Sequence, residues 1–233
     1  MSPPISTTPD GFPRDAWELF RERLTPARSA KLARVAASRT RRIRLVLQDL
    51  HDFHNIAACL RSAEAFGIAA VDVVDRKSRF LNSTVSRGAR DWLIVKRWGS
   101  EQECAAALHA DGYRIIGAYP DADATPLPAV PVTTPLAVVF GNEKEGLSPE
   151  WKTAIDERFT IPMVGMVESF NISVAAAITL YDLTSRARTT LPEGQYHLSD
   201  GERRDLLCGW VCRSIPHFEG ELERLRSSAL PPI

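Results

Sequence analysis

Short, mostly apolar runs alternate with helix-like segments along the middle of the chain, and this alternation limits the folds open to it. Two of these runs, Ile43–Gln48 (IRLVLQ) and Leu136–Phe140 (LAVVF), are too short to cross a membrane and carry apolar side chains on both faces of a strand. Strands of this kind are typical of a parallel sheet that helices cover on both sides. We therefore predict an α/β fold with a mostly parallel sheet and helices on both faces.

Other segments continue the alternation of strands and helices. Further strands are predicted at residues 70–75, 92–98, 113–118 and 156–163. Helices are predicted after the polar turn at residues 49–55, at Glu101–Ala110, and from Ser148 with Pro149 at the first helical position. Asn55 stands where a helix cap is needed, and Gly67 is expected to end the same helix in a left-handed conformation. Residues 121–135 are rich in proline and are expected to form a connection.

Residues 161–183 (IPMVGMVESFNISVAAAITLYDL) join a loop rich in Gly and Met to a nearly uncharged helix. Ser169, Asn171 and Ser173 crowd the start of that helix, where their side chains can bond to its first amides. A capped core helix and the wall of a ligand pocket both fit this pattern. Two more polar strand-to-helix junctions, HNIAACLRSAEAFG and VVFGNEKEGLSPE, favour the pocket, because open α/β sheets bind ligands beyond the carboxyl ends of their strands.

These three junctions, taken in order, resemble the three motifs of the SpoU/TrmH family of RNA ribose 2'-O-methyltransferases. The resemblance covers residues 41–188. The residues that carry it are Asn55, Arg61, Glu64 and Gly67 in the first motif, Gly141, Asn142, Glu143 and Gly146 in the second, and Ser169, Asn171, Ser173 and Ala175 in the third. Phe170 departs from the family pattern, which more often has Leu there.

The resemblance implies a fold, a cofactor and an assembly. Members of this family, which belongs to the SPOUT superfamily, bind S-adenosyl-L-methionine in a carboxy-terminal trefoil knot, and a second subunit of a homodimer completes their active site. The implied fold is an α/β domain with such a knot and with helical extensions at both ends. No metal is expected. Cofactor contacts, mostly through the backbone, are expected at Ala118, Gly141, Ile161, Met163 and Phe170.

The resemblance also implies methyl transfer to a ribose 2'-hydroxyl, with Arg61 as the key residue. A guanidinium is effectively always protonated, so Arg61 is poorly suited to act as a general base. Stabilisation of the developing alkoxide is the favoured role for Arg61. The residues expected to hold Arg61 in place are Asn55, Glu143 and Ser169. Asn171 is expected to line the cofactor and reaction site.

Three features are similar to those of family members that modify transfer RNA: a basic amino-terminal helix, a helical tail and no separate amino-terminal RNA-binding domain. The implied target is the D-loop guanosine at position 18 of tRNA. The same chemistry on ribosomal RNA or on the tRNA anticodon loop is the alternative. A noncatalytic RNA-binding module is a more distant alternative, which the intact set of motif residues disfavours.

Basic residues are concentrated near the amino terminus, although 29 basic and 29 acidic residues give a formal net charge of zero. Residues 21–44 hold nine basic residues and one acidic residue, Glu22, so the rest of the chain is net acidic. A solvated helix face or a surface that follows RNA phosphates would produce such a segment, and its length favours RNA. The candidate RNA contacts, which share one face of a helix, are Lys31, Arg34 and Arg41. A second basic segment, residues 76–89, is either an RNA-facing loop or an ordinary exposed loop.

Helices are expected outside the α/β domain at both ends of the chain. They are predicted at residues 14–23 and 26–40, and, after a linker at residues 191–198, at 200–214 and 218–227. The predicted organisation is a basic helical extension at residues 1–42, a methyltransferase domain at 43–190 and a helical tail at 191–233.

The sequence gives no support to several other classes of protein. It contains no GxGxxG dinucleotide fingerprint, no GxxxxGK[ST] phosphate loop and no GxSxG hydrolase motif. The four cysteines, which lack metal-ligand spacing and are expected to be reduced and buried, are Cys59, Cys104, Cys208 and Cys212. No apolar run approaches the ~20 residues of a membrane span, and no signal peptide is recognisable, so a cytoplasmic protein is expected.

Overall fold

The computed structural model describes residues 7–50, 52–75, 87–121, 123–142, 144–192 and 194–229. The chain forms two compact units. The terminal unit contains both ends of the chain, up to Arg39 and from His197 onwards, and the sheet unit spans residues 40–196. The division into three parts after residues 42 and 190 stays a prediction.

The sheet unit contains a seven-stranded sheet with the strand order β3-β2-β1-β6-β4-β7-β5. Its strands are β1 (Ile43–Gln48), β2 (Ala70–Val74), β3 (Ile94–Trp98), β4 (Arg114–Ala118), β5 (Thr125–Pro126), β6 (Leu136–Phe140) and β7 (Glu157–Thr160). Each neighbouring pair of these strands is parallel. The predicted parallel α/β fold is therefore confirmed.

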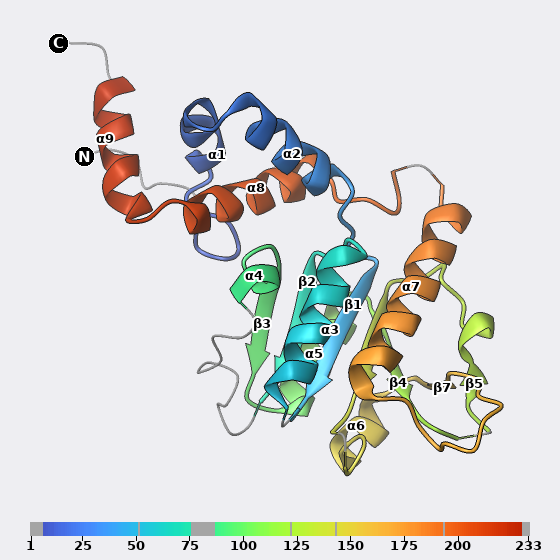
Figure 1. Ribbon diagram of the computed structural model, residues 1–233. Coiled ribbons are helices and arrows are strands. Elements are labelled where there is room, and N and C mark those ends of the chain that lie inside the picture. Colours follow the sequence, from blue (N-terminus) through green and yellow to red (C-terminus); the bar gives the residue numbers. More distant parts are fainter. Residues whose placement is uncertain are drawn as a thin grey trace. The chain divides into compact units, whose positions relative to one another are not determined.

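Helices cover both faces of this sheet (Figure 1). They are α3 (Phe53–Ala65), α4 (Arg87–Arg90), α5 (Glu101–Ala110), α6 (Pro149–Ala154) and α7 (Ile172–Thr190). Helices α3 and α7 lie side by side over one face, and α5 and α6 pack together over the other. Successive side chains of β1 enter different cores, because Leu45 and Leu47 pack with α3 and α7 whereas Val46 packs with α5. This explains why the central strands are apolar at almost every position.

The cap of α3 differs from the prediction. Asp52 has an extended backbone and accepts a hydrogen bond from the His54 N–H at 2.8 Å, so it is the last residue before the helix. The predicted capping role of Asn55 is therefore wrong, because Asn55 already lies in the first turn of α3. The predicted end is confirmed, since Gly67 follows the helix with a φ of 82°.

Other bounds differ from the prediction as well: the helix predicted at residues 26–40 ends at Ala37, and β3 begins at Ile94 rather than at residue 92. Strand β7 ends at Thr160 rather than at residue 163, because its neighbours β4 and β5 pair with it only as far as Phe159 and Thr160. The stretch at residues 121–135 contributes β5 and the short 3-10 helix η3 (Leu127–Ala129) rather than a plain connection. The burial of Leu127 and Val130 fixes this stretch against the core.

The second basic segment falls largely outside the described residues. Residues 76–86 are not among them, so neither interpretation of that loop is tested. Its last residues belong to the short helix α4.

The terminal unit is built from helices contributed by both ends of the chain. They are α1 (Ala16–Phe20), the 3-10 helix η1 (Arg21–Arg23), α2 (Pro26–Ala37), α8 (Asp200–Ser214) and α9 (Phe218–Ala229). Helix α8 packs against α1 and α2 and buries Leu206, Trp210 and Val211. An ion pair of 2.6 Å between Asp15 and Arg226 joins the first helical region to the last. The two predicted tail helices are confirmed.

The basic residues of segment 21–44 do not form one exposed surface. Arg39 is fully buried, and its guanidinium lies 5.4 Å from the centre of the Trp210 ring. Arg44 is buried in the central strand β1, where it pairs with Asp72 at 2.7 Å. Burial raises the pKa of Asp72, an effect that the charge of Arg44 opposes. The interpretation of the segment as a phosphate-binding surface is therefore wrong for Arg39 and Arg44.

All four cysteines are buried and free, as predicted. In the described part of the chain, no helix has both the length and the apolar character needed to cross a membrane. No group of three or more His, Cys, Asp or Glu side chains within those ranges is arranged to hold a metal ion.

Candidate active site

Four neighbouring strands of the sheet unit, β1, β6, β4 and β7, end at one edge of the sheet. Strand β1 leads into α3, β6 leads into α6 through loop 141–148, and β7 leads into α7 through residues 161–171. Because the carboxyl ends of parallel strands meet at the same edge, the three polar junctions of the sequence converge there.

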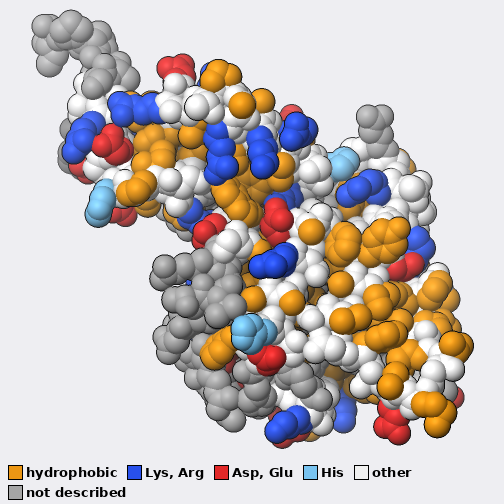
Figure 2. Space-filling model, viewed as in Figure 1, with side chains coloured by type: hydrophobic (Ala, Val, Ile, Leu, Met, Phe, Trp, Pro, Cys, Tyr) orange, Lys and Arg blue, Asp and Glu red, His pale blue; other side chains and the backbone are white. Residues whose placement is uncertain are grey.

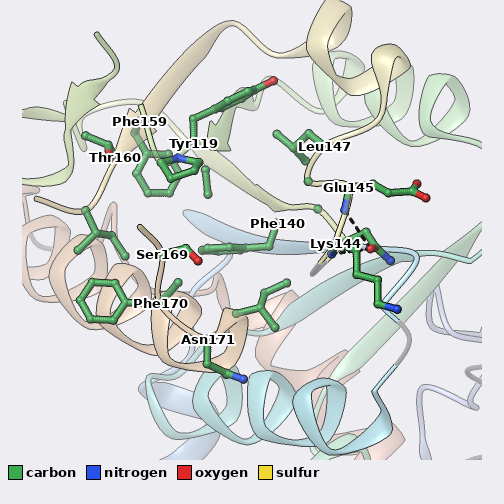
Figure 3. A pocket seen from close by; sticks show the side chains of 18 of the residues that line it. Tyr119, Phe140, Lys144, Glu145, Leu147, Phe159, Thr160, Ser169, Phe170 and Asn171 are labelled. Atoms are coloured by element: carbon green, nitrogen blue, oxygen red, sulfur yellow. Dashed lines mark hydrogen bonds between the residues drawn. The ribbon is translucent and has the colours of Figure 1, made fainter. Parts of the chain in front are cut away.

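A cavity of about 660 Å³ lies beyond these strand ends, between loop 141–148 and residues 161–171 (Figure 3). Ligand pockets in proteins typically measure about 300–1,000 Å³, so this cavity can hold a small organic molecule. Apolar side chains form one wall and the loop forms the opposite wall. The principal lining residues are Phe140, Phe159, Ile161 and Phe170 on the apolar side, and Gly141 and Gly146 in the loop.

Gly141 allows the two ends of the loop to approach each other. Asn142 and Gly146 exchange backbone hydrogen bonds of 2.9 Å in both directions, which closes a tight turn. A Cβ added to Gly141 would lie 2.3 Å from backbone atoms of Gly146, a distance that real Cβ atoms essentially never show. This wall of the cavity therefore requires glycine at position 141.

Gly141→Ala is expected to lower the free energy of unfolding by about 1–3 kcal/mol, because rigid backbone rather than a flexible side chain has to move. Urea unfolding measures the loss. Gly165→Ala is the matched control, since a Cβ on Gly165, in the neighbouring loop, would meet nothing within 4 Å. Equal stabilities of the two variants would contradict the steric argument.

Asn171 connects the first and third motifs. Its side chain caps α7 by accepting a hydrogen bond from the Ser173 N–H at 2.9 Å, which confirms the predicted start of this helix. The Nδ2 group of Asn171 also donates to Oδ1 of Asn55 on α3, at 3.1 Å. Both ends of the Asn171 amide are thus engaged beside the cavity.

The structure brings most of the predicted site residues together. The five residues expected to contact a cofactor all line the cavity, and they are Ala118, Gly141, Ile161, Met163 and Phe170. Ser169 and Asn171 line it as well, and Asn55 is connected to it through Asn171. Glu143 lies outside the described residues.

Arg61 does not line the cavity of its own chain. It is exposed on α3, six residues after Asn55, which corresponds to about 9 Å along a helix axis. Among the residues that the structure describes, none forms an ion pair with Arg61. Its side chain is exposed, so a group from outside the chain can approach the guanidinium.

The aromatic wall was not predicted from the sequence. Phe140 and Phe159 come from strands β6 and β7, which lie on either side of β4, and Tyr119 directly follows β4. All three stand at or beside the carboxyl end of a strand, which is the signal that could have identified them. Burial raises the pKa of Tyr119, an effect that Arg158 opposes, so this phenol is neutral at pH 7.

The candidate RNA contacts do not share one helix face. Lys31 and Arg34 are exposed on α2 in the terminal unit. Helix α2 ends at Ala37, and Arg41 is a half-buried residue of the sheet unit. The predicted helix face therefore includes Lys31 and Arg34 but not Arg41.

The fold and the cavity show to which class the protein belongs. It is one of the open parallel α/β proteins that have a cavity beyond the ends of their strands. The sequence model of the SpoU rRNA methylase family matches residues 42–181, which is more than half of the chain. The chain belongs to this family.

Individual relatives support the assignment. The tRNA (guanosine(18)-2'-O)-methyltransferase of Borreliella burgdorferi is 31% identical over 197 residues, which cover 84% of this chain and 89% of that protein. The 23S rRNA (guanosine-2'-O-)-methyltransferase RlmB of Xanthomonas campestris is 36% identical over 151 residues, 64% of this chain and 60% of that protein. The crystal structure of the A. aeolicus TrmH/SpoU tRNA modifying enzyme superposes with a TM-score of 0.72 at 25% identity, over 82% of this chain and 98% of that one.

Proposed function

We propose that this protein transfers a methyl group from S-adenosyl-L-methionine to the ribose 2'-hydroxyl of guanosine 18 in the D loop of tRNA. The observation that carries the proposal is that residues of the second and third motifs line one cavity beyond the strand ends, with Asn55 of the first motif bonded to Asn171 there. The choice of RNA is supported by the Borreliella relative, which is named for this reaction and matches 84% of the chain. A protein that acts on tRNA is expected in the cytoplasm.

The chemistry of the cavity suits this cofactor. The exposed ring of Phe170, in a cavity lined by further apolar side chains, offers a surface of the kind that binds a purine ring. Backbone groups near Gly141 and Ile161 can approach a ligand closely, and they offer hydrogen bonds to its polar atoms. When bound, the cofactor supplies a methyl group carried by a positively charged sulfur.

Residues of all three motifs are proposed to act on the ribose hydroxyl. The hydroxyl is a weak nucleophile that loses its proton as the new bond forms, so its oxygen becomes more negative in the transition state. Arg61 is proposed to stabilise that charge. Asn55, Glu143 and Ser169 are proposed to hold the guanidinium, and Asn171 to line the reaction site.

A second copy of the chain is proposed to complete the site. Large apolar side chains are exposed around the cavity and along α7, and they are Val164, Met166, Val167, Phe170, Val174 and Tyr181. Figure 2 shows apolar side chains gathered over the region of α7 and the loop before it. An apolar patch of this kind marks a protein interface, and a two-fold homodimer would cover the same patch on both subunits. We further propose that the carboxy-terminal part of the sheet unit forms the trefoil knot that is typical of the family.

Lys31 and Arg34 are proposed to contact RNA phosphates, together with Arg41. The double variant Lys31→Gln, Arg34→Gln is expected to reduce the slope of log affinity against log salt concentration by about 1 per residue. Binding of a tRNA transcript between about 50 and 200 mM salt measures this slope. Lys96→Gln is the control, because Lys96 is an exposed lysine of the sheet unit. An unchanged slope in the double variant would make α2 an ordinary solvated helix.

The function is tested by methylation assays with labelled cofactor and defined RNAs. A tRNA transcript with guanosine 18 should become 2'-O-methylated at that nucleotide, and the same transcript with adenosine 18 should not. Fragments of 23S rRNA belong in the same assay, because the Xanthomonas relative is named for that RNA. Methylation of the rRNA fragments alone would favour the rRNA function, and absence of cofactor binding by the folded protein would overturn both.

A further inference from the structure

The carboxyl end of β1 contacts both ends of loop 141–148. At one end, Nδ2 of Asn142 donates a hydrogen bond to the carbonyl oxygen of Asp49 at 2.8 Å. At the other end, the Ser148 N–H donates to Oε1 of Gln48 at 3.1 Å. The side chains of Asn142 and Gln48 are both buried, with 6% and 3% of their surfaces exposed. The loop that forms one wall of the cavity is thus fixed to a central strand at two points.

Gln48 also contacts a third element. Its Nε2 group donates to Oε1 of Glu101, in the first turn of α5, at 3.4 Å. Glu101 is itself only 2% exposed. The Gln48 amide therefore accepts a bond from the loop and donates a bond to a buried carboxylate. The position needs a side chain of this size that both accepts and donates a hydrogen bond. A glutamate carboxylate can only accept, and leucine can do neither.

We propose that Gln48 is a positioning residue for the cofactor wall, although it does not line the cavity. The loop reaches the cavity through Gly141, Gly146 and Leu147, and Ser148 is the residue at which it passes into α6. Without the Gln48 acceptor, the Ser148 N–H is left without its partner and this end of the loop is no longer fixed to β1. The inference rests on the proposed function of the cavity, because its readout is binding of S-adenosyl-L-methionine.

Gln48→Leu removes both hydrogen bonds and keeps a side chain of similar volume. We expect the Kd for S-adenosyl-L-methionine to rise about tenfold, the effect of one lost buried hydrogen bond. The single-turnover methylation rate at saturating cofactor should change less than about threefold, because the loop binds the cofactor rather than the ribose. Calorimetry and quenched-flow methylation give the two values.

A pair of exchanged side chains separates positioning from general loss of packing. Gln48→Glu alone places a second carboxylate against Glu101, so it should weaken cofactor binding at least as much as Gln48→Leu. Adding Glu101→Gln to Gln48→Glu restores one amide and one carboxylate, with the carboxylate now accepting from the Ser148 N–H. The double variant should bind the cofactor within about threefold of the wild type, because the same bonds can form with exchanged partners.

Gln102→Leu is the control for these variants, since Gln102 is an exposed glutamine next to Glu101 on α5. If Gln48→Leu binds S-adenosyl-L-methionine with wild-type affinity, the inference is overturned. It is also overturned if Gln48→Glu loses cofactor affinity and the double variant Gln48→Glu, Glu101→Gln does not regain it. If both single variants fail to fold, recovery of folding and binding in the double variant supports the inference, and its absence overturns it. Absence of binding by the wild-type protein would instead refute the proposed function.

Discussion

Arg61→Ala is expected to slow single-turnover methylation of tRNA by about 10²–10³-fold, the usual effect of losing one well-placed electrostatic group. The affinity for S-adenosyl-L-methionine should stay nearly unchanged, because Arg61 does not line the cavity. A fixed cation matters most when the ribose oxygen becomes anionic, so its loss raises the barrier without weakening the bound ground state. Saturating cofactor isolates the chemical step in this measurement.

Arg61→Lys tests the nature of the contact. An ammonium carries the same charge but lacks the planar fork of a guanidinium, so this variant should recover only a small part of the rate. Full recovery would show that charge alone suffices. A near wild-type rate in Arg61→Ala would refute the proposed mechanism while leaving the family assignment intact.

Mixed dimers of Arg61→Ala and Asn171→Ala are expected to regain activity that neither variant has alone. If each site combines Arg61 of one chain with Asn171 of the other, a dimer of the two variants contains one site with both residues intact. Random pairing makes half of all dimers mixed, so an equal mixture should reach about one quarter of wild-type activity. Coexpression with two different affinity tags gives the mixed dimers in pure form.

The same experiment can contradict the shared site. Purified mixed dimers that remain inactive would show that Arg61 serves the cavity of its own chain. Mixing the two variants after folding, without exchange of subunits, is the control and should give no recovery. A monomeric protein at assay concentration would remove the basis of the prediction.

The fold was predictable because local sequence and tertiary burial agree for most elements. Strands β1 and β6 are apolar on both faces, as a sheet between two layers of helices requires. The cap of α3 was misassigned because Asp52 and Asn55 are both good capping residues, and backbone conformation selects between them. The buried Arg39 was not predictable from its basic neighbours, because its partner Trp210 lies far away in the sequence.

The site was predictable only in part, because some of its contacts join residues that are far apart in the sequence. Ser169 and Asn171 could be located because they stand directly at the start of a helix that follows a strand. The role of Gln48 in holding the loop is invisible in the sequence, since the bond to Ser148 joins residues 100 positions apart. Arg61 was selected by family resemblance, and a single chain does not bring it to the cavity.

Both ends of the chain contribute to the terminal unit, so this unit cannot be completed on the ribosome until the last helices are made. Helices α1 and α2 pack on α8, and Asp15 pairs with Arg226, so the first helices made depend on the last ones. The sheet unit, residues 40–196, can bury its own core before α8 is translated. During synthesis, α1 and α2 therefore have no α8 to pack against, and their apolar faces stay uncovered until α8 is made. A premature stop codon after residue 196 would leave the sheet unit intact and deprive α1 and α2 of their partners.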